Sequence, residues 1–141
     1  MALPIQKFRE AVFQLLYSME FHTSSDDELV SMLMQELKVT KKNANEALEK
    51  AKKVAAAKEQ IDALLGAQVE DYSVERIHSV ERNVLRLALY EAVIEKTLPL
   101  EIAIAESKRL LKKFSTNEAE SFVQAIIDAI YKKESETGSK E

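Results

Sequence analysis

The sequence predicts an all-α protein, and three features of its composition support that prediction. The 141 residues include only two glycines and two prolines, too few for a sheet-rich protein that needs a turn about every ten residues. The strong helix formers Leu, Ala, Glu and Lys are abundant. With 46% hydrophobic residues, a chain of this length can bury one core, and its length alone favours a single compact domain.

Apolar residues at helical spacing predict about seven helices joined by short polar segments. Pro4 suits the first turn of a helix, because the N–H that proline lacks would be unpaired there. Pro99 interrupts the pattern after Leu98 and begins another helix. The expected helices cover residues 4–21, 26–37, 41–65, 80–96, 99–113 and 116–132, with one short turn starting at Ser73. Residues 1–132 are expected to form the domain and residues 133–141 a disordered charged tail.

Local capping signals define the predicted helix ends. Ser25 and Glu28 have the Ser-x-x-Glu spacing in which each side chain accepts a hydrogen bond from the other residue's backbone. The same spacing predicts a capping box from Ser115 to Glu118. The remaining signals are single residues at helix ends, namely Thr40 before residue 41, Gly66 after residue 65 and Ser79 before residue 80.

Two of the expected helices have distinctive apolar surfaces. The helix over 41–65 carries alanines on its inner face, which indicates close contact with a neighbouring helix. The helix over 80–96 is apolar on almost every side, with Val84, Leu85, Leu87, Ala88, Leu89, Ala92, Val93 and Ile94. A helix of that kind is predicted to lie at the centre of a bundle.

The charge balance and the missing cysteines exclude several classes of protein. With 20 basic and 24 acidic residues, the net charge is −4, which argues against a protein that coats nucleic acid through its overall field. Any nucleic-acid site must therefore be local. The absence of cysteine excludes disulfide scaffolds, zinc fingers and thiol enzymes. Neither a signal peptide nor a run of about 18 apolar residues is present, so a cytoplasmic location without a membrane partner is expected.

The sequence offers no constellation for catalysis. His22 and His78 lie in predicted connectors without the partners that a metal site needs. Gly66 and Gly138 are the only glycines, so a Gly-rich phosphate loop is excluded. The serines stand mainly at helix starts, where capping explains them. We therefore expect no enzyme activity, no metal and no cofactor.

One local pattern of charge favours nucleic acid. Lys108, Arg109, Lys112 and Lys113 share one side of the helix over 99–113, and the start of the next helix offers free N–H groups that can hold a phosphate. Phe122 follows within that helix, and an aromatic ring beside basic groups can stack on an unpaired base. Two other interpretations stay open: cations at a helix C-terminus stabilise it without a ligand, and a phenylalanine at helical spacing is commonly a core residue.

Several runs of residues have a specific order and spacing. The most specific is 84–91, Val84-Leu85-Arg86-Leu87-Ala88-Leu89-Tyr90-Glu91, within the longer run 79–91. Supporting runs are 9–11, 14–17, 102–106 after Pro99, 112–115 and 122–123. In these runs the chain resembles the NusB family of bacterial transcription antitermination factors. The likeness covers residues 5–20 and 78–131, whereas residues 22–70 match in helical character only.

The resemblance implies an all-helical fold of two small packed bundles and a non-enzymatic role. Members of the family bind the boxA element of nascent ribosomal RNA transcripts with the ribosomal protein NusE, in a complex on elongating RNA polymerase, and alone they are monomers or homodimers. By position, the resemblance assigns RNA contacts to Lys7, Arg9, Lys112, Lys113 and Phe122. It places Tyr17, Glu81 and Glu118 at or near the surface that meets NusE and RNA.

The chain departs from the family pattern at three places. Lys7 is the only basic residue before Arg9, where the family commonly has several arginines, so RNA binding without a partner is expected to be weak. Ala105 and Ala125 stand where the family usually has Asn and Gly. The alternative function is a helical protein–protein module that keeps the fold with weak or lost RNA recognition. A helical domain of ribosomal RNA methyltransferases is a weaker alternative, because 141 residues leave no room for the catalytic domain.

Overall fold

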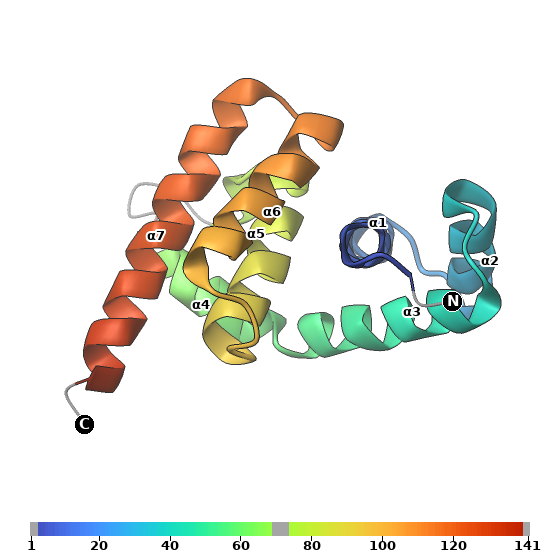
Figure 1. Cartoon of the computed structure of the whole chain (residues 1–141), viewed down its shortest axis with the longest axis horizontal. Coiled ribbons are helices and arrows are strands. Elements are labelled where there is room, and N and C mark those ends of the chain that lie inside the picture. Colours follow the sequence, from blue (N-terminus) through green and yellow to red (C-terminus); the bar gives the residue numbers. More distant parts are fainter. Residues whose placement is uncertain (1–2, 69–73, 140–141) are drawn as a thin grey trace. The chain divides into compact units, whose positions relative to one another are not determined.

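Residues 3–68 and 74–139 are described in the computed structural model of the protein (Figure 1). Every regular element within these ranges is helical, which confirms the predicted fold class. In chain order the elements are α1 (Ile5–Phe21), α2 (Asp26–Leu37), α3 (Lys41–Ala56), α4 (Lys58–Gln68), η1 (Val74–Arg76), α5 (Ser79–Leu89), η2 (Tyr90–Ile94), α6 (Leu100–Phe114) and α7 (Asn117–Ser139). The chain divides into two compact units, Met1–Ala56 and Ala57–Glu141, as the two small bundles implied by the resemblance require.

The first unit is a bundle of three helices in which α1 and α2 both pack on α3 (Figure 1). Three alanines of α3, Ala44, Ala47 and Ala51, have no exposed surface. Because side chains this small shorten the distance at which two helices can pack, α1 lies close against α3. The predicted role of the alanine-bearing face is therefore confirmed.

Two predicted caps of the first unit are present. The Ser25 hydroxyl oxygen accepts a hydrogen bond from the backbone N–H of Glu28 at 3.1 Å, and the Glu28 carboxylate accepts one from the backbone N–H of Ser25 at 3.2 Å. This reciprocal pair is a complete capping box for α2. Thr40 caps α3 by accepting from the backbone N–H of Asn43 at 3.1 Å.

The second unit is built around α5, which packs on α4, α6 and α7. Val84, Leu85 and Leu89 are at most 1% exposed, and this burial on several sides confirms that the helix lies at the centre of its bundle. Pro99 stands directly before α6, at the predicted break. No helix in the described part of the chain is long and apolar enough to cross a membrane.

The predicted helix over 41–65 is wrong, because the chain breaks it at Ala57 into α3 and α4. The apolar stripe continues across the break, but the residues before and after it are buried in the cores of different units. Val54 is buried in the first unit, whereas Ile61 and Leu65 are buried in the second. Gly66 does not end the helix either: it lies inside α4, which runs to Gln68.

The predicted helix over 80–96 starts one residue earlier and changes its geometry. His78 occupies the N-cap position of α5 without a side-chain cap bond, so Ser79 is a helical residue and not the cap. After Leu89 the chain widens into the π-helical segment η2. Lys96 then takes a left-handed conformation with φ 57°, which ends the helix before the turn to Pro99.

The predicted capping box of Ser115 and Glu118 is also wrong. α7 begins at Asn117, and the Ser115 side chain bonds elsewhere. The helix continues to Ser139, so it includes residues 133–139 of the expected tail. Ser73, the predicted start of a short turn, lies outside the described residues, and η1 begins at the next position.

Candidate nucleic-acid interface

The basic edge of α6 consists of Lys108, Arg109, Lys112 and Lys113. Its four cations differ in exposure: Lys112 and Lys113 are exposed, whereas Lys108 and Arg109 are half-buried. The Arg109 guanidinium contacts the Glu106 carboxylate at 3.4 Å, which offsets its charge. The outer end of the edge therefore presents the positive charge to solvent.

An aromatic ring stands at this outer end. The Lys113 ammonium lies 5.9 Å from the centre of the Phe114 ring, within the distance at which a cation is attracted to an aromatic face. Phe114 is half-buried at the last position of α6. Exposed cations and a partly exposed ring thus share the corner where α6 ends.

This corner is tied to the start of α5. The Ser115 hydroxyl donates a hydrogen bond to Oε1 of Glu81 at 2.5 Å, across 34 positions of the chain. The other carboxylate oxygen, Oε2, lies 3.1 Å from Nδ1 of His78 and has no aligned hydrogen bond. Glu81 is only 8% exposed, whereas the His78 side chain is 74% exposed.

The predicted residues of α7 lie one turn apart. Glu118 is exposed and Phe122 is half-buried, and their i, i+4 spacing puts them on one side of the helix. Ala119, Val123 and Ile126, which flank Phe122 along the helix, are buried. The Phe122 ring therefore sits at the margin of the core, with part of its surface open to a ligand.

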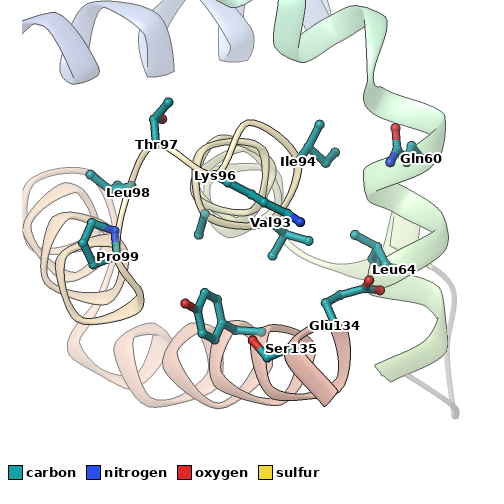
Figure 2. Close-up of a pocket in the computed structure, with 12 residues that line it drawn as sticks. Gln60, Leu64, Val93, Ile94, Lys96, Thr97, Leu98, Pro99, Glu134 and Ser135 are labelled. Carbon is teal, nitrogen blue, oxygen red and sulfur yellow. The ribbon is translucent and has the colours of Figure 1, made fainter. Parts of the chain in front are cut away.

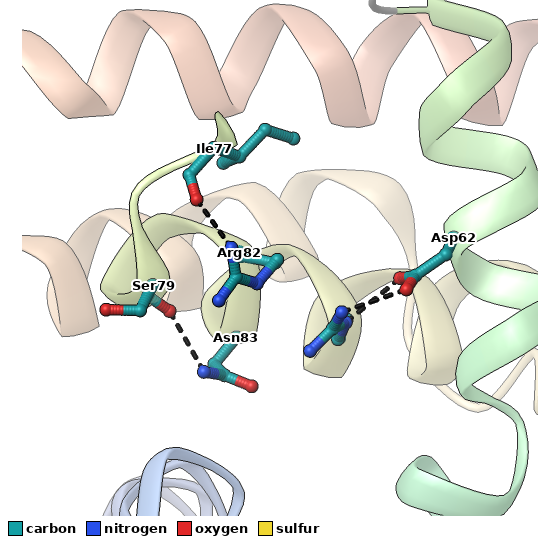
Figure 3. Close-up of polar contacts among 6 residues, drawn as sticks. Asp62, Ile77, Ser79, Arg82 and Asn83 are labelled. Carbon is teal, nitrogen blue, oxygen red and sulfur yellow. Dashed lines mark hydrogen bonds and ion pairs between the residues drawn. The ribbon is translucent and has the colours of Figure 1, made fainter. Parts of the chain in front are cut away.

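The arginines of α5 are bound inside the second unit (Figure 3). Arg86 forms two 2.9 Å hydrogen bonds to the Asp62 carboxylate of α4, and it is 8% exposed. Arg82 donates to the carbonyl of Ile77 at 2.8 Å, and burial, with a smaller effect of the Arg86 charge, lowers the pKa of Arg82. These arginines hold α5 in place and do not form part of the exposed basic edge.

A further polar contact closes the first turns of α5. The Asn83 amide, 1% exposed, donates to the carbonyl of Ser79 at 2.9 Å (Figure 3). Sequence reasoning missed these contacts. The available signal was the presence of Arg82, Asn83 and Arg86 on a helix that is otherwise apolar on almost every side, because a buried polar group requires a partner.

The first unit carries the other predicted site residues. Lys7 is half-buried, and Arg9 is only 6% exposed. Tyr17 is 38% exposed and stands in a row of rings along α1, 6.2 Å from Phe13 and 5.0 Å from Phe21 between ring centres. Phe21 is 52% exposed, and it was not among the predicted site residues although its i, i+4 spacing from Tyr17 is visible in the sequence.

The second unit also has a surface cavity of about 880 Å³ between α4, η2 and α7. Half-buried apolar side chains line it, among them Leu64, Val93, Ile94 and Leu98, together with the charged side chains of Lys96 and Glu134 (Figure 2). Within residues 3–68 and 74–139, no group of three or more acidic, histidine or cysteine side chains is placed to hold a metal ion.

The two units define an all-helical protein with a basic corner that also carries an aromatic ring, and comparisons with known proteins identify its family. A model of the NusB family matches residues 6–132. The transcription antitermination protein NusB of Chlamydia trachomatis serovar A is 40% identical over 131 residues, which cover 91% of this chain and 78% of that protein. The chain therefore belongs to the NusB family.

Other relatives support the same family and fold. NusB of Thermotoga maritima is 33% identical over 132 residues, covering 94% of this chain and 93% of that protein, and a solved structure of T. maritima NusB matches with a TM-score of 0.77 at 34% identity, over 94% and 93% of the two chains. A crystal structure of antitermination factors NusB and NusE in complex with dsRNA contains a chain that matches with a TM-score of 0.76 at 26% identity, over 91% and 96%.

Proposed function

We propose that this protein is a transcription antitermination factor that binds boxA RNA of nascent ribosomal RNA transcripts together with NusE, on elongating RNA polymerase in the cytoplasm. Membership of the NusB family supports the role in antitermination. The relative solved with NusE and dsRNA supports both partners. The observation that carries the proposal is the corner of Lys112 and Lys113, exposed at the end of α6 and tied to α5 through Ser115 and Glu81.

Each proposed residue has a separate role in binding RNA or the partner. Lys112 and Lys113 neutralise phosphates, and each such contact makes binding more sensitive to salt. Phe122 stacks on an unpaired base with the exposed part of its ring. Lys7 and Arg9 supply positive charge from the first unit, with Lys7 the more accessible of the two. By resemblance, Tyr17 of the first unit and Glu118 of the second contact NusE or RNA, and the buried Glu81 lies near such a contact.

RNA binding depends on NusE in this proposal. The net charge of −4 and the presence of only two exposed cations, Lys112 and Lys113, on the basic edge limit the affinity of the protein alone. A bound partner that also contacts the RNA raises the effective concentration of each site near the other. We therefore expect weak binding by the isolated protein and much tighter binding by the complex.

A gel-shift assay with boxA RNA and a scrambled RNA tests the proposal, at several salt concentrations with and without NusE. The variant Lys112→Glu/Lys113→Glu should weaken binding to boxA RNA at least about tenfold. It should also reduce the slope of log affinity against log salt concentration by the amount expected for about two lost phosphate contacts. The matched control is Lys41→Glu/Lys42→Glu, a second exposed lysine pair, which should bind as the wild type does. Equal binding of boxA and scrambled RNA in the presence of NusE would refute the proposal.

The alternative function is a protein–protein module without RNA recognition. Arg9 is buried, and Ala105 and Ala125 are exposed at positions where the family usually has Asn and Gly. In that case NusE binds, but Lys7→Glu and the α6 double variant leave the RNA affinity of the complex unchanged. The same gel shifts distinguish the two functions.

A further inference from the structure

We infer that Ser115 is a positioning residue of the RNA surface, because its hydrogen bond to the buried Glu81 carboxylate fixes the end of α6 that carries Lys112 and Lys113. The inference rests on the proposed function, since these two lysines are its RNA contacts. It gives Glu81 an indirect role, in which the carboxylate affects RNA binding through Ser115 and does not touch the RNA.

The backbone of Ser115 lies where the chain leaves α6. Its N–H donates a hydrogen bond to the carbonyl of Leu111 at 2.7 Å, and Leu111 has no exposed surface. With φ −141° and ψ −147°, Ser115 itself is not helical, and α7 begins two residues later at Asn117. The conformation of Ser115 therefore determines how the last turn of α6 leads into the next helix.

The side chain of Ser115 joins this connection to a third helix. Its hydroxyl donates to Oε1 of Glu81 at 2.5 Å, and Glu81 lies in the first turn of α5 with 8% of its surface exposed. Hydrogen bonds to an ionised carboxylate are stronger than those between neutral groups. A serine that capped α7 would bond within the connection itself, whereas this bond holds the connection against the central helix of the unit.

The two exposed lysines depend on the order of the same turn. Lys112 and Lys113 are in the last turn of α6, within three positions of Ser115. Helix ends fray, because their last carbonyl groups lack partners within the helix. If this turn frays, bound RNA has to order both lysines, and that ordering reduces the affinity. The bond from Ser115 to Glu81 orders the turn before RNA binds.

Two substitutions at position 115 test the role of the hydroxyl. Ser115→Ala removes it, whereas Ser115→Thr keeps it on a β-branched residue that suits extended backbone. We expect S115A to weaken binding of boxA RNA by the complex with NusE about fivefold, the effect of one net hydrogen bond. S115T should bind within about twofold of the wild type, as should the control Ser31→Ala at an exposed serine of α2. Wild-type binding by S115A would overturn the inference.

A double-mutant cycle tests whether the effect passes through the lysines. In the Lys112→Glu/Lys113→Glu background, S115A should change the RNA affinity by less than about 1.5-fold, because no cations remain to be positioned. A loss as large as that in the wild-type background would overturn the inference, since the hydroxyl would then act on RNA binding by another route.

Substitutions of Glu81 test the other end of the bond. Glu81→Gln keeps an oxygen that can accept from Ser115, and Glu81→Ala removes it. We expect E81Q to bind RNA within about twofold of the wild type and E81A to bind as weakly as S115A. The double variant S115A/E81A should bind no more weakly than either single variant. Additive losses would contradict a shared role of the two residues.

Amide hydrogen exchange tests the order of the turn without RNA. The Ser115 amide, which is bonded to Leu111, should exchange at least about threefold faster in E81A than in the wild type, and E81Q should restore slow exchange. Equal exchange in E81A and the wild type would show that the bond does not hold the turn, and would overturn the inference.

Failure of the inference can be distinguished from failure of the proposed function. If the Lys112→Glu/Lys113→Glu variant loses RNA binding while S115A binds as the wild type does, Ser115 is not a positioning residue although the RNA surface is correct. If the complex with NusE binds boxA and scrambled RNA equally, the proposed function fails and the inference fails with it.

Discussion

The helices α3 and α5, on which their respective units pack, are buried in different ways. All buried residues of α3 are Ala, Leu or Val on one face. α5 is buried on almost every side, and its buried residues include Glu81, Asn83 and Arg86. The face of α3 follows from a period of 3.6 residues in the sequence. Asn83 donates to a carbonyl of its own helix, but Arg86 and Glu81 have partners elsewhere in the chain, which only the folded structure brings near.

The largest effect on stability is expected when a side chain that pairs with α5 is removed. Asp62→Ala leaves the buried Arg86 guanidinium without its carboxylate, and breaking a buried pair from one side is strongly destabilising. Because the Asp62 side chain is 23% exposed and water reduces the effect, we expect a loss of about 2 to 4 kcal/mol in the free energy of unfolding. Urea unfolding followed by circular dichroism measures it.

The matched control is Lys52→Ala in the first unit. It removes an ion pair to Asp26 in which the two side chains are 51% and 59% exposed. We expect a loss below about 1 kcal/mol. Similar losses in D62A and K52A would mean that the Arg86 pair is no more important than a surface pair.

The second effect tests the close packing of α3. Ala51 has no exposed surface, so Ala51→Leu inserts a large side chain into a filled space and should lower the free energy of unfolding by about 1 to 3 kcal/mol. Asn45→Leu, at an exposed position of the same helix, should change it by less than about 0.5 kcal/mol. Thermal unfolding compares the two variants, and an unchanged melting temperature for A51L would show that α3 does not pack closely at Ala51.

The third effect compares two identical sequence patterns. Ser25 and Glu28 form a capping box, whereas Ser115 and Glu118 do not. Glu28→Ala should therefore lower the free energy of unfolding by about 0.5 to 1 kcal/mol, and Glu118→Ala should change it by less than about 0.5 kcal/mol. The midpoints of urea unfolding measure both changes. Equal losses of unfolding free energy in E28A and E118A would show that Ser115 and Glu118 form the capping box that the sequence predicts.

The smallest expected effect is a gain in stability, whereas the preceding substitutions reduce stability. A glycine that ends a helix in left-handed geometry is destabilised by any side chain, but Gly66 lies inside α4 and an added Cβ would meet its nearest atom, in Val74, at 4.0 Å. Gly66→Ala should stabilise the protein by about 0.5 to 1 kcal/mol. A lower melting temperature for G66A would contradict the position of Gly66 within the helix.

Most of the fold could be predicted because its signals are local. The bounds of α2 match the prediction, since the capping box and apolar spacing are properties of consecutive residues. The break at Ala57 could not be predicted, because no proline or glycine marks it and the apolar stripe continues across it from Val54 in one unit to Ile61 in the other. The π-helical geometry of η2 could not be predicted either, because it does not alter the spacing of apolar residues in the sequence.

The candidate site was predictable in part. Lys112 and Lys113 are exposed, as expected for cations at a helix end. Their connection to α5 was not visible, because Ser115 and Glu81 are 34 positions apart and a capping box offered a local explanation for the serine. His78 was considered only as a metal ligand, although Glu81, the carboxylate that it contacts, is three positions along the chain.

The sequence by itself determined the helical class, the family, most helix ends and the position of the basic edge, because these depend on composition and on neighbours within a few turns. The tertiary structure decided where one long apolar stripe divides between two cores. It also decided which polar side chains of α5 are buried with partners, among them Arg86 with Asp62 and Glu81 with Ser115. These features depend on contacts between distant parts of the chain, whose favourable energy exists only when packing excludes water from them.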